Sequence, residues 1–389
     1  MNPRVFVLAL STFSFGSSAF IFAGLLESLA ADLGVSTATA GQLQTVYVLT
    51  SALAGPPLAM LLGSRERKTI LLSALGAAIL CSLLCTMAAD FQQLLGLRVV
   101  LGAIAALAGP SASIMAASLV PPEKRGSAMA TVTGGMTIAF LLGIPMGSVV
   151  GAFFGWRATF LLSAFLSIIA FTAVSLFTPR VVPPAPVKGG KLDIVTALPL
   201  WATTFLAFGA NMTMSTYLAP IIRMQTGVVG AGVGAFQLMI GVGSFLGLYL
   251  GGRSADRGAG GLSVGLAFLA LGLGAGLHTL ELWGGAPPGP ATYAVVCLAI
   301  LIAATSLFSI MPVVQSRLVA ALPTAAALAL ALNGSAASLG QALGGANGGL
   351  MLSHFGGPAI TLSAMALAAM GATFWFLTAG RVRQATVTA

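Results

Sequence analysis

Long apolar runs alternate with short polar breaks along the whole chain. Twelve of the runs have the length that a helix needs to cross the ~30 Å hydrocarbon core of a bilayer, roughly twenty residues. The charged side chains stand mostly in the breaks. The pattern therefore predicts an all-α membrane protein with transmembrane helices at residues 5–27, 43–62, 69–88, 92–120, 127–152, 158–177, 196–221, 229–251, 261–282, 291–314, 325–353 and 358–379.

The composition supports this prediction. Hydrophobic residues make up 58% of the 389 positions and charged residues 6%, whereas a soluble domain carries about 25% charge. The net charge of +9 would favour nucleic-acid binding in a soluble protein. Here the cations stand at the ends of apolar runs and form no patch with interleaved aromatics. We interpret the first run as a retained span, with a signal peptide as the alternative, because it lacks a small-residue cleavage site.

The basic residues gather in alternate breaks. Of the 17 lysines and arginines, 14 lie on one side of the predicted membrane. The other three are Arg98, inside a span, and Arg157 and Arg223, at the opposite side. Because cytoplasmic loops carry the excess of lysine and arginine, both termini are expected in the cytoplasm.

One cytoplasmic break is long and rich in proline, glycine and lysine: "TPRVVPPAPVKGGKLD", Thr178 to Asp193. It predicts a solvated linker at 178–195 between a six-helix bundle at 1–177 and a second at 196–389. Residues 201 positions apart also match, as in Pro122 and Pro323, Gly143 and Gly344, Gly147 and Gly348, and Phe154-Gly155 and Phe355-Gly356. Two pseudo-symmetric halves with a site between them at mid-membrane are typical of a transporter that rocks between two states.

Residues that could carry other chemistry are few. Cys81, Cys85 and Cys297 lie inside apolar runs and favour packing over disulfides. His278 and His354 stand at the outer ends of spans, and no H-E-x-x-H pattern occurs, which disfavours a membrane enzyme and a metal site. A channel would need a repeated pore loop or a charged ring, and neither is visible. We expect no cofactor, no metal and no nucleic-acid partner.

Two loops at equivalent places resemble one motif. "GGRSADRG", Gly251 to Gly258, closes the eighth span, and "LLGSRERKTILL", Leu61 to Leu72, follows the second. Both resemble the loop motif G-x-L-A-D-R-x-G-R-R of the major facilitator superfamily. The second-half copy keeps Asp256 and Arg257, whereas the first has Gly63 and Ser64 in their place and keeps Arg67 and Lys68. The resemblance implies a charge latch on the cytoplasmic side, half missing here, and an ordinary charged loop is the alternative.

Two further stretches resemble motifs of that superfamily. "LRVVLGAIAAL", Leu97 to Leu107, is similar to the fourth-span R-x-x-Q-G motif, with Leu101 where glutamine is usual. An arginine in lipid is costly, so Arg98 is expected to face the bundle interior, with snorkelling to the interface as the alternative. "GGMTIAFLLGIPMGSVVGAFFGWRATF" places Gly143 and Gly147 four apart with Pro145 between them, and it resembles the fifth-span antiporter motif. Small residues at this spacing predict close helix contact.

The first two spans give the resemblance that bears most on mechanism. "FGSSAFIFAGLLESLAADLGVS" and "AGQLQTVYVLTSALAGPPLAMLL" are similar to the drug:proton antiporter family, in its sugar- and arabinose-efflux branch, as is "TYLAPII" in the seventh span. That branch carries G-T-S-E-F in its first span, and the glutamate is a natural proton carrier. Here the position is Ala19, and Glu27 stands where the branch has proline. We interpret Glu27 as a hydrated carboxylate at the outer helix end, with proton coupling as its alternative role.

The resemblance implies the major facilitator fold and a monomeric exporter of the bacterial inner membrane. The expected function is secondary active export of a small sugar-like or drug-like solute by alternating access, with protons as the candidate coupling ion. An uncoupled facilitator of the same fold is the alternative, because the first-span acid is missing. Polar and aromatic residues at mid-span are the candidates for solute contact, and each could equally serve interhelical packing. They are Phe13, Ser17, Phe20, Gln44, Tyr47, Arg98, Asn211, Tyr217, Ser306, Asn333 and Gln341.

Overall fold

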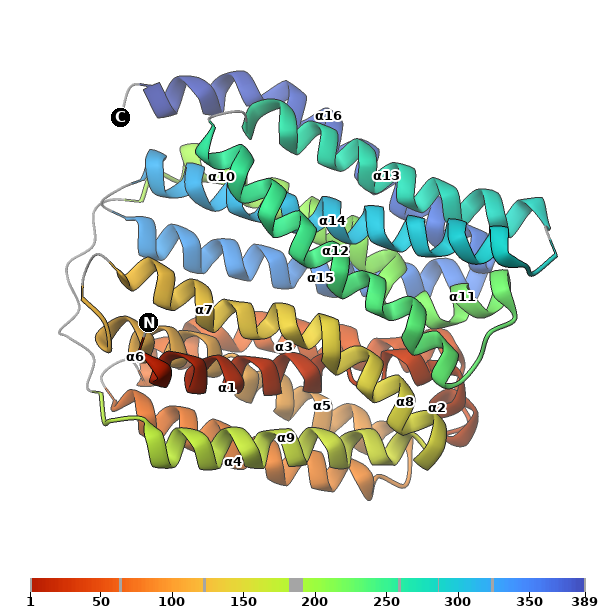
Figure 1. The fold of residues 1–389 in the computed structure, drawn as a ribbon, viewed down its shortest axis with the longest axis horizontal. Coiled ribbons are helices and arrows are strands. Elements are labelled where there is room, and N and C mark those ends of the chain that lie inside the picture. Colours follow the sequence, from red (N-terminus) through yellow and green to blue (C-terminus); the bar gives the residue numbers. More distant parts are fainter. Residues whose placement is uncertain are drawn as a thin grey trace. The chain divides into compact units, whose positions relative to one another are not determined.

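A computed structural model of the protein describes residues 2–62, 65–121, 124–181, 192–257, 260–285, 287–322 and 325–387. Within these ranges the chain is helical, and no β-strand occurs there (Figure 1). The helices belong to two compact units, one formed by Met1–Ala185 with Gly230–Leu238 and the other by Pro186–Val229 with Met239–Ala389. Most of the predicted linker, residues 182–191, lies outside the described residues.

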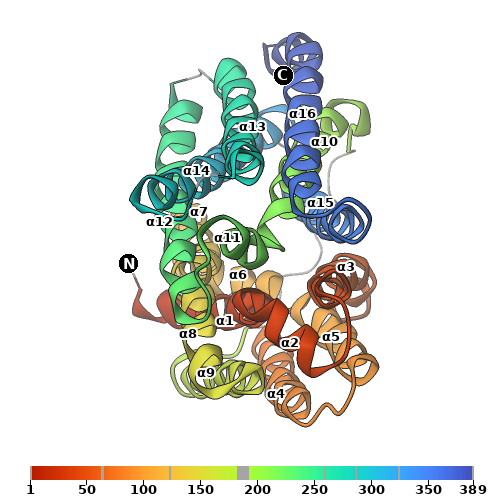
Figure 2. The ribbon, with the colours of Figure 1, turned by 90° about the vertical axis from the view of Figure 1, so that its right-hand side faces the viewer.

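The first unit contains the helices of the first six predicted spans. They are α1 (Pro3–Phe20), the 3₁₀ turn η1 (Ala23–Leu25), α2 (Leu26–Asp32), α3 (Thr37–Leu62), α4 (Arg67–Thr86), α5 (Phe91–Ala105), α6 (Ala108–Ser118), α7 (Arg125–Ile138), the π-helical turn η3 (Ala139–Gly143), α8 (Ile144–Phe154) and α9 (Trp156–Phe177). Within this unit α4 lies beside α9 and α1 beside α7, as Figures 1 and 2 show.

The second unit contains α10 (Ile194–Ser215), α11 (Leu218–Thr226), α13 (Gly260–Gly284), α14 (Pro290–Ala321), α15 (Ala326–Phe355), α16 (Gly357–Val387) and the larger part of α12 (Ala231–Asp256). Here α10 packs on α15, and α13 packs on both α14 and α16. Its core is apolar and includes Phe268 and Trp375, both fully buried.

Each predicted span coincides with a helix or with a broken helix. Ten helical segments of the described residues are long and apolar enough to cross a membrane. The predicted spans 43–62 and 325–353 correspond to α3 and α15, which have 26 and 30 residues. At about 1.5 Å per residue they are about 39 and 45 Å long, more than the ~30 Å core requires. The prediction of an all-α membrane protein is confirmed.

Glycines of the fifth span bring it into contact with the first. A Cβ atom at Gly143 would collide with the Ser17 side chain, one at Gly147 with the Ile21 carbonyl oxygen, and one at Gly151 with Leu25. These glycines recur every four residues, and so do their neighbours, so the two helices approach along matching faces. Pro145 lacks a backbone N–H, and η3 lies just before it, where the regular hydrogen-bond ladder is interrupted.

The second unit repeats this contact. A Cβ atom at Gly340, Gly344 or Gly348 of α15 would collide with a backbone carbonyl oxygen of α10, that of Phe205, Gly209 or Thr213 respectively. Gly344 and Gly348 are the counterparts of Gly143 and Gly147 at the offset of 201. Each stripe is followed by a glycine at φ +81°, Gly155 in the first unit and Gly356 in the second. The internal repeat of the sequence is therefore also a repeat of helix packing.

The start of α10 offers a prediction about pH. The Asp193 carboxylate accepts hydrogen bonds from the Thr196 hydroxyl at 2.6 Å and from the Val195 and Thr196 amides at 3.0 and 3.4 Å. Chiefly the Thr196 hydroxyl, and then the amides, lower the pKa of Asp193 below its ordinary value of 3.8. Because the folded-state pKa is depressed, the cap stabilises the helix start at pH values above 3.8 and loses this effect as the pH falls through the folded-state pKa.

We expect the protection of the Val195 and Thr196 amides in hydrogen–deuterium exchange, corrected for the intrinsic pH dependence of exchange, to fall as the pH drops through the lowered folded-state pKa of Asp193. Asp193→Asn keeps the capping acceptor without a titrating group, so its exchange should lack this pH step. In Asp193→Ala the Val195 and Thr196 amides should have low protection from exchange at every pH. A pH step that persists in the asparagine variant would assign it to another group.

Candidate functional site

The first span of each unit is interrupted. In the first unit α1 ends at Phe20, and η1 separates it from α2. In the second unit α10 ends at Ser215, and α11 begins at Leu218. The last carbonyl groups of a helix have no intrahelical donor, so each interruption offers backbone acceptors to other groups. Interrupted spans at corresponding places in two halves are the feature that best indicates a solute site in a membrane transporter.

Arg98 occupies the interruption of the first unit. Its side chain extends from α5 and is fully buried. Nη1 donates to the Ser18 carbonyl at 2.9 Å, and Nη2 donates to the Ala19 carbonyl at 2.9 Å. Both acceptors belong to the last turn of α1, where the helix dipole favours a positive charge. Arg98 therefore caps the end of α1 from another span.

Other groups complete the surroundings of Arg98. Its Nε donates to the Leu43 carbonyl at 3.3 Å, and the guanidinium lies 4.3 Å from the centre of the Tyr47 ring and 4.9 Å from that of Phe22. The Tyr47 hydroxyl donates to the Phe15 carbonyl at 3.3 Å. A buried charge is normally paired with an opposite charge. Here carbonyl dipoles and aromatic faces surround it, and among the described residues no aspartate or glutamate is buried.

Two candidates of the first unit, Ser17 on α1 and Gln44 on α3, and their chain neighbours Ser18 and Thr45 carry buried polar atoms. Ser17 Oγ, Ser18 Oγ, Gln44 Nε2 and Thr45 Oγ1 are buried and have no hydrogen-bond partner within the described protein. Buried polar groups are nearly always paired. These four atoms are therefore exceptions to that rule.

The aromatic candidates of this unit differ in their surroundings. The Phe20 ring packs against Phe140 of η3, with the ring centres 4.8 Å apart, whereas Phe13 is half-buried. Phe20 therefore joins the first span to the fifth. Arg98 and Tyr47 are enclosed by protein, so neither lines an open space in this structure.

The second-unit candidates lie on α10, α14 and α15. The Thr204 hydroxyl donates to Asn333 Oδ1 at 2.7 Å, which makes Asn333 part of an interhelical contact. Asn211 accepts from Ser215 of the same helix at 2.9 Å. Tyr217 is fully buried at the interruption, and its ring lies against Gly348.

The two remaining candidates of this unit, Ser306 and Gln341, have no interhelical hydrogen bond like that between Thr204 and Asn333 within the described part of the chain. The Ser306 hydroxyl donates to the Ile302 carbonyl of its own helix at 2.7 Å. Gln341 is half-buried on α15. Among the first-unit candidates, Tyr47 lies against Arg98, whereas the Ser17 side chain faces Gly143 and Phe20 faces Phe140. The second-unit candidates are distributed over α10, α14, α15 and the interruption between α10 and α11.

The basic residues after the second span bind a helix end. Lys68 Nζ donates to the Ser175 carbonyl at 2.8 Å and to the Thr178 carbonyl at 2.6 Å, so it caps α9. Arg67 is half-buried at the start of α4. Asp256 ends α12, and it and Arg257 are exposed. A latch made by these two residues stays a prediction, which cross-linking of helix ends in Asp256→Asn would test.

The outer ends of the spans carry a second polar cluster. Asp32, at the end of α2, accepts from Trp156 Nε1 at 2.9 Å and pairs with Arg157 at 2.5 Å. Arg157 also donates to the Ala88 carbonyl at 3.3 Å. Glu27 is half-buried in the first turn of α2, where a negative charge complements the helix dipole. Among the described residues, no group of three metal-binding side chains occurs.

Comparison with known proteins identifies the family. The model of the Major Facilitator Superfamily matches residues 8–287. The chain belongs to the major facilitator superfamily. It is 29% identical over 359 residues to the inner membrane transport protein YdhP of Escherichia coli O157:H7, a match that covers 91% of this chain and 90% of that protein.

Other relatives support the same family. The uncharacterized MFS-type transporter YfhI of Bacillus subtilis is 32% identical over 260 residues, 65% of this chain and 66% of that protein. The chloramphenicol resistance protein of Streptomyces lividans is 31% identical over 269 residues, 66% of this chain and 68% of that protein.

Two solved structures share the fold of this major facilitator protein. A bacterial homologue of the human lysosomal transporter Spinster has a TM-score of 0.74 at 18% identity and covers 99% of both chains. The peptide transporter POT has a TM-score of 0.79 at 14% identity and covers 98% of this chain and 95% of the other. The predicted major facilitator fold is confirmed.

Sequence reasoning missed most partners in this site. It named Arg98, Tyr47 and Lys68, but their acceptors are backbone carbonyls, which every residue carries and which no sequence pattern distinguishes. The pairing of Asp32 with Arg157 was also missed. The opposite charges at two outer ends were a usable clue, because both residues were predicted on the same side of the membrane.

Proposed function

We propose that this protein exports a small, neutral or amphipathic organic solute across the bacterial inner membrane by alternating access. The observation that carries the proposal is the enclosed Arg98 at the interruption of α1, in a unit that also buries unpaired polar atoms of Ser17, Gln44 and Thr45. This arrangement supplies polar contacts without a buried carboxylate. It therefore favours uncharged or anionic solutes over cations. The chloramphenicol resistance relative supports a drug-like neutral solute.

The missing first-span acid supports a second candidate, an uncoupled facilitator. Proton-driven exchange needs a group that gains and loses a proton at depth in the membrane. The place of the family's glutamate is Ala19, whose carbonyl accepts from Arg98, and the described acids lie exposed or half-buried. We therefore propose that coupling to protons is weak or absent, and that Glu27 is a peripheral group.

Transport in proteoliposomes distinguishes the two candidates. With chloramphenicol as the first solute, we expect saturable flux that changes by less than about twofold when a pH gradient is imposed, because no buried acid is available to translocate protons. Vesicles loaded with a pH-sensitive dye measure proton movement during transport of the same solute. Sugars, nucleosides and cationic dyes form the comparison panel.

Glu27→Gln is the matched variant for this experiment. An uncoupled protein should transport equally well with either residue. Stoichiometric proton flux that disappears in Glu27→Gln would instead establish proton antiport through Glu27. Absence of flux for every solute, in a protein that is folded and reconstituted, would contradict the transport proposal.

We further propose that the basic breaks face the cytoplasm, because 14 of the 17 cations lie on that side. A cysteine in place of Arg180, whose side chain is 87% exposed, should resist an impermeant maleimide in intact cells. A cysteine in place of the exposed Ser353 should react with it. Labelling of the wild-type protein measures any reaction of the native Cys81, Cys85 and Cys297. The reverse labelling pattern of the two variants would overturn the orientation.

A further inference from the structure

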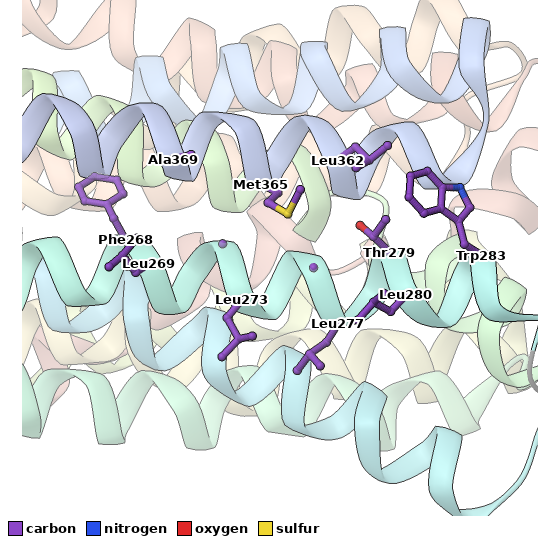
Figure 3. A pocket seen from close by; sticks show the side chains of 12 residues that line it. Phe268, Leu269, Leu273, Leu277, Thr279, Leu280, Trp283, Leu362, Met365 and Ala369 are labelled. Carbon is purple, nitrogen blue, oxygen red and sulfur yellow. The ribbon is translucent and has the colours of Figure 1, made fainter.

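An apolar groove runs along the outside of the second unit between α13 and α16. It encloses about 500 Å³. Phe268, Leu273 and Trp283 line it from α13, and Leu362 and Met365 line it from α16, as Figure 3 shows. Leu273 and Leu280 are exposed by 56% and 67%, so the groove opens away from the protein. In a membrane-spanning unit, the medium on that side is lipid.

Small residues create the groove. Gly272 and Gly276 lie on the face of α13 toward α16 and have no side chain to fill the space. A Cβ atom at Gly276 would meet Met365 Sδ at 3.6 Å, and one at Gly272 would meet the Ala368 Cβ at 3.7 Å. Both distances are ordinary contacts, so the hollow results from missing side-chain volume. Tight helix packing does not require glycine at these two positions.

Aromatic rings lie at the Phe268 end of the groove. The Phe268 ring is fully buried and occupies the space that a Cβ atom at Gly371 would need. The Phe376 ring similarly covers Gly265. At the opposite end the Trp283 side chain is 64% exposed. The groove thus extends from the buried Phe268 ring to Trp283, a tryptophan, the residue that favours the membrane interface.

The lining excludes a polar ligand. Thr279 contributes the one hydroxyl among the lining residues, and it donates to Thr361 Oγ1 at 2.7 Å, while its oxygen lies 3.0 Å from the Ala275 carbonyl oxygen. The Thr361 hydroxyl in turn donates to the Pro358 carbonyl at 3.0 Å. No residue of the groove has a buried polar atom without a partner. A ligand that matches this surface is a flexible hydrocarbon.

The length of the groove identifies the hydrocarbon. Phe268 and Trp283 are fifteen residues apart on one helix, about 22 Å along its axis. One leaflet with its headgroup region is roughly 20 Å deep. We propose that a phospholipid of the surrounding bilayer inserts one acyl chain into this groove as a resident ligand, with its headgroup beside Trp283. The inference does not depend on the transported solute.

Photolabelling tests the proposal. The protein is reconstituted with a phosphatidylethanolamine that carries a diazirine in one acyl chain, irradiated, digested and mapped by mass spectrometry. We expect Leu269–Leu280 and Leu362–Ala369 to be labelled roughly tenfold more per residue than the exposed Leu161 and Phe165 of α9. At a constant mole fraction of the probe, replacing other bilayer lipids by unlabelled phosphatidylethanolamine should reduce this labelling and leave the α9 reference unchanged.

Filling the groove is the decisive variant. Gly276→Leu places a side chain in the groove where Cβ has room, and should lower groove labelling to the α9 level. Gly96→Leu is the matched control, because Gly96 is an exposed helical glycine with no atom within 4 Å of an added Cβ. It should label like the wild type. The lipid competition in the wild type provides the test if Gly276→Leu fails to fold.

Other occupants would give different results, each of which overturns the proposal. Groove labelling equal to that of α9, or unchanged in a folded Gly276→Leu variant, would mean ordinary contact with bulk lipid. Displacement of the label by chloramphenicol would assign the groove to a transported solute. Disulfide-linked dimers of Leu280→Cys in membranes, absent in the wild type, would assign it to a second copy of this chain.

Discussion

Replacing Arg98 by methionine is expected to destabilise the first unit and to lower solute transport by at least about tenfold. Methionine keeps an unbranched apolar stem but has no donors, so the Ser18 and Ala19 carbonyls lose the groups that now bind them at 2.9 Å. A buried acceptor without a donor costs about 1–3 kcal/mol, so the two together should lower the free energy of unfolding by about 2–6 kcal/mol. Thermal unfolding in detergent and flux in proteoliposomes measure the two effects.

Arg98→Lys separates charge from geometry. Lysine keeps the positive charge but concentrates its donors at one ammonium group, which cannot reproduce the fork that reaches Ser18, Ala19 and Leu43. If capping of the broken helix is the main role, the lysine variant should be closer to methionine than to the wild type. If it behaves as the wild type, the charge itself is what the site needs. Full transport by Arg98→Met would refute both roles.

Replacing Gly147 by alanine is expected to disrupt the contact between the fifth and first spans. The new Cβ atom would collide with the Ile21 carbonyl oxygen, which is backbone and cannot turn away as a flexible side chain could. Overpacking of this kind costs about 1–3 kcal/mol, and occasionally more. Because the collision lies at the interruption of α1, we expect transport to fall together with the thermal unfolding temperature.

The second half of the chain offers a variant equivalent to Gly147→Ala, and both halves offer glycines that serve as controls. Gly348→Ala should be equally harmful, because its Cβ atom would collide with the Thr213 carbonyl oxygen. Gly134→Ala and Gly334→Ala lie on the same two spans with nothing within 4 Å of the added atom. They should be neutral or slightly stabilising, since alanine is the better helix former by about 1 kcal/mol. Equal losses in all four variants would show that glycine flexibility, and not close approach, is what matters.

Much of the fold was predictable because the bilayer imposes it locally. A span must satisfy its own backbone hydrogen bonds and present apolar side chains over a set length, so each run of the sequence carries its own evidence. The Gly143 and Gly147 spacing likewise indicated a close helix contact. The sequence could not show which helix they meet, and the contacts with Ser17 and Ile21 identify it as the first span.

The candidate site was predictable only in part. Arg98 stood out because a cation inside an apolar run demands an explanation. The carbonyl groups that accept its hydrogen bonds could not be recognised in the sequence, because they are main-chain atoms 55 to 80 positions away. The pairing of Asp32 with Arg157, 125 positions apart, similarly depends on where two helices end.

The sequence by itself determined the class of this protein: a membrane-spanning, all-helical chain with an internal repeat and with no acid at depth in its first span. These properties follow from side-chain type and spacing, and they do not depend on which helices become neighbours. Only the tertiary structure decided that α1 is broken, that Arg98 caps the break through carbonyl groups, and that α13 and α16 leave a leaflet-deep groove. These features are set by distances between groups far apart in the chain, where a shift of one helix turn would exchange every partner.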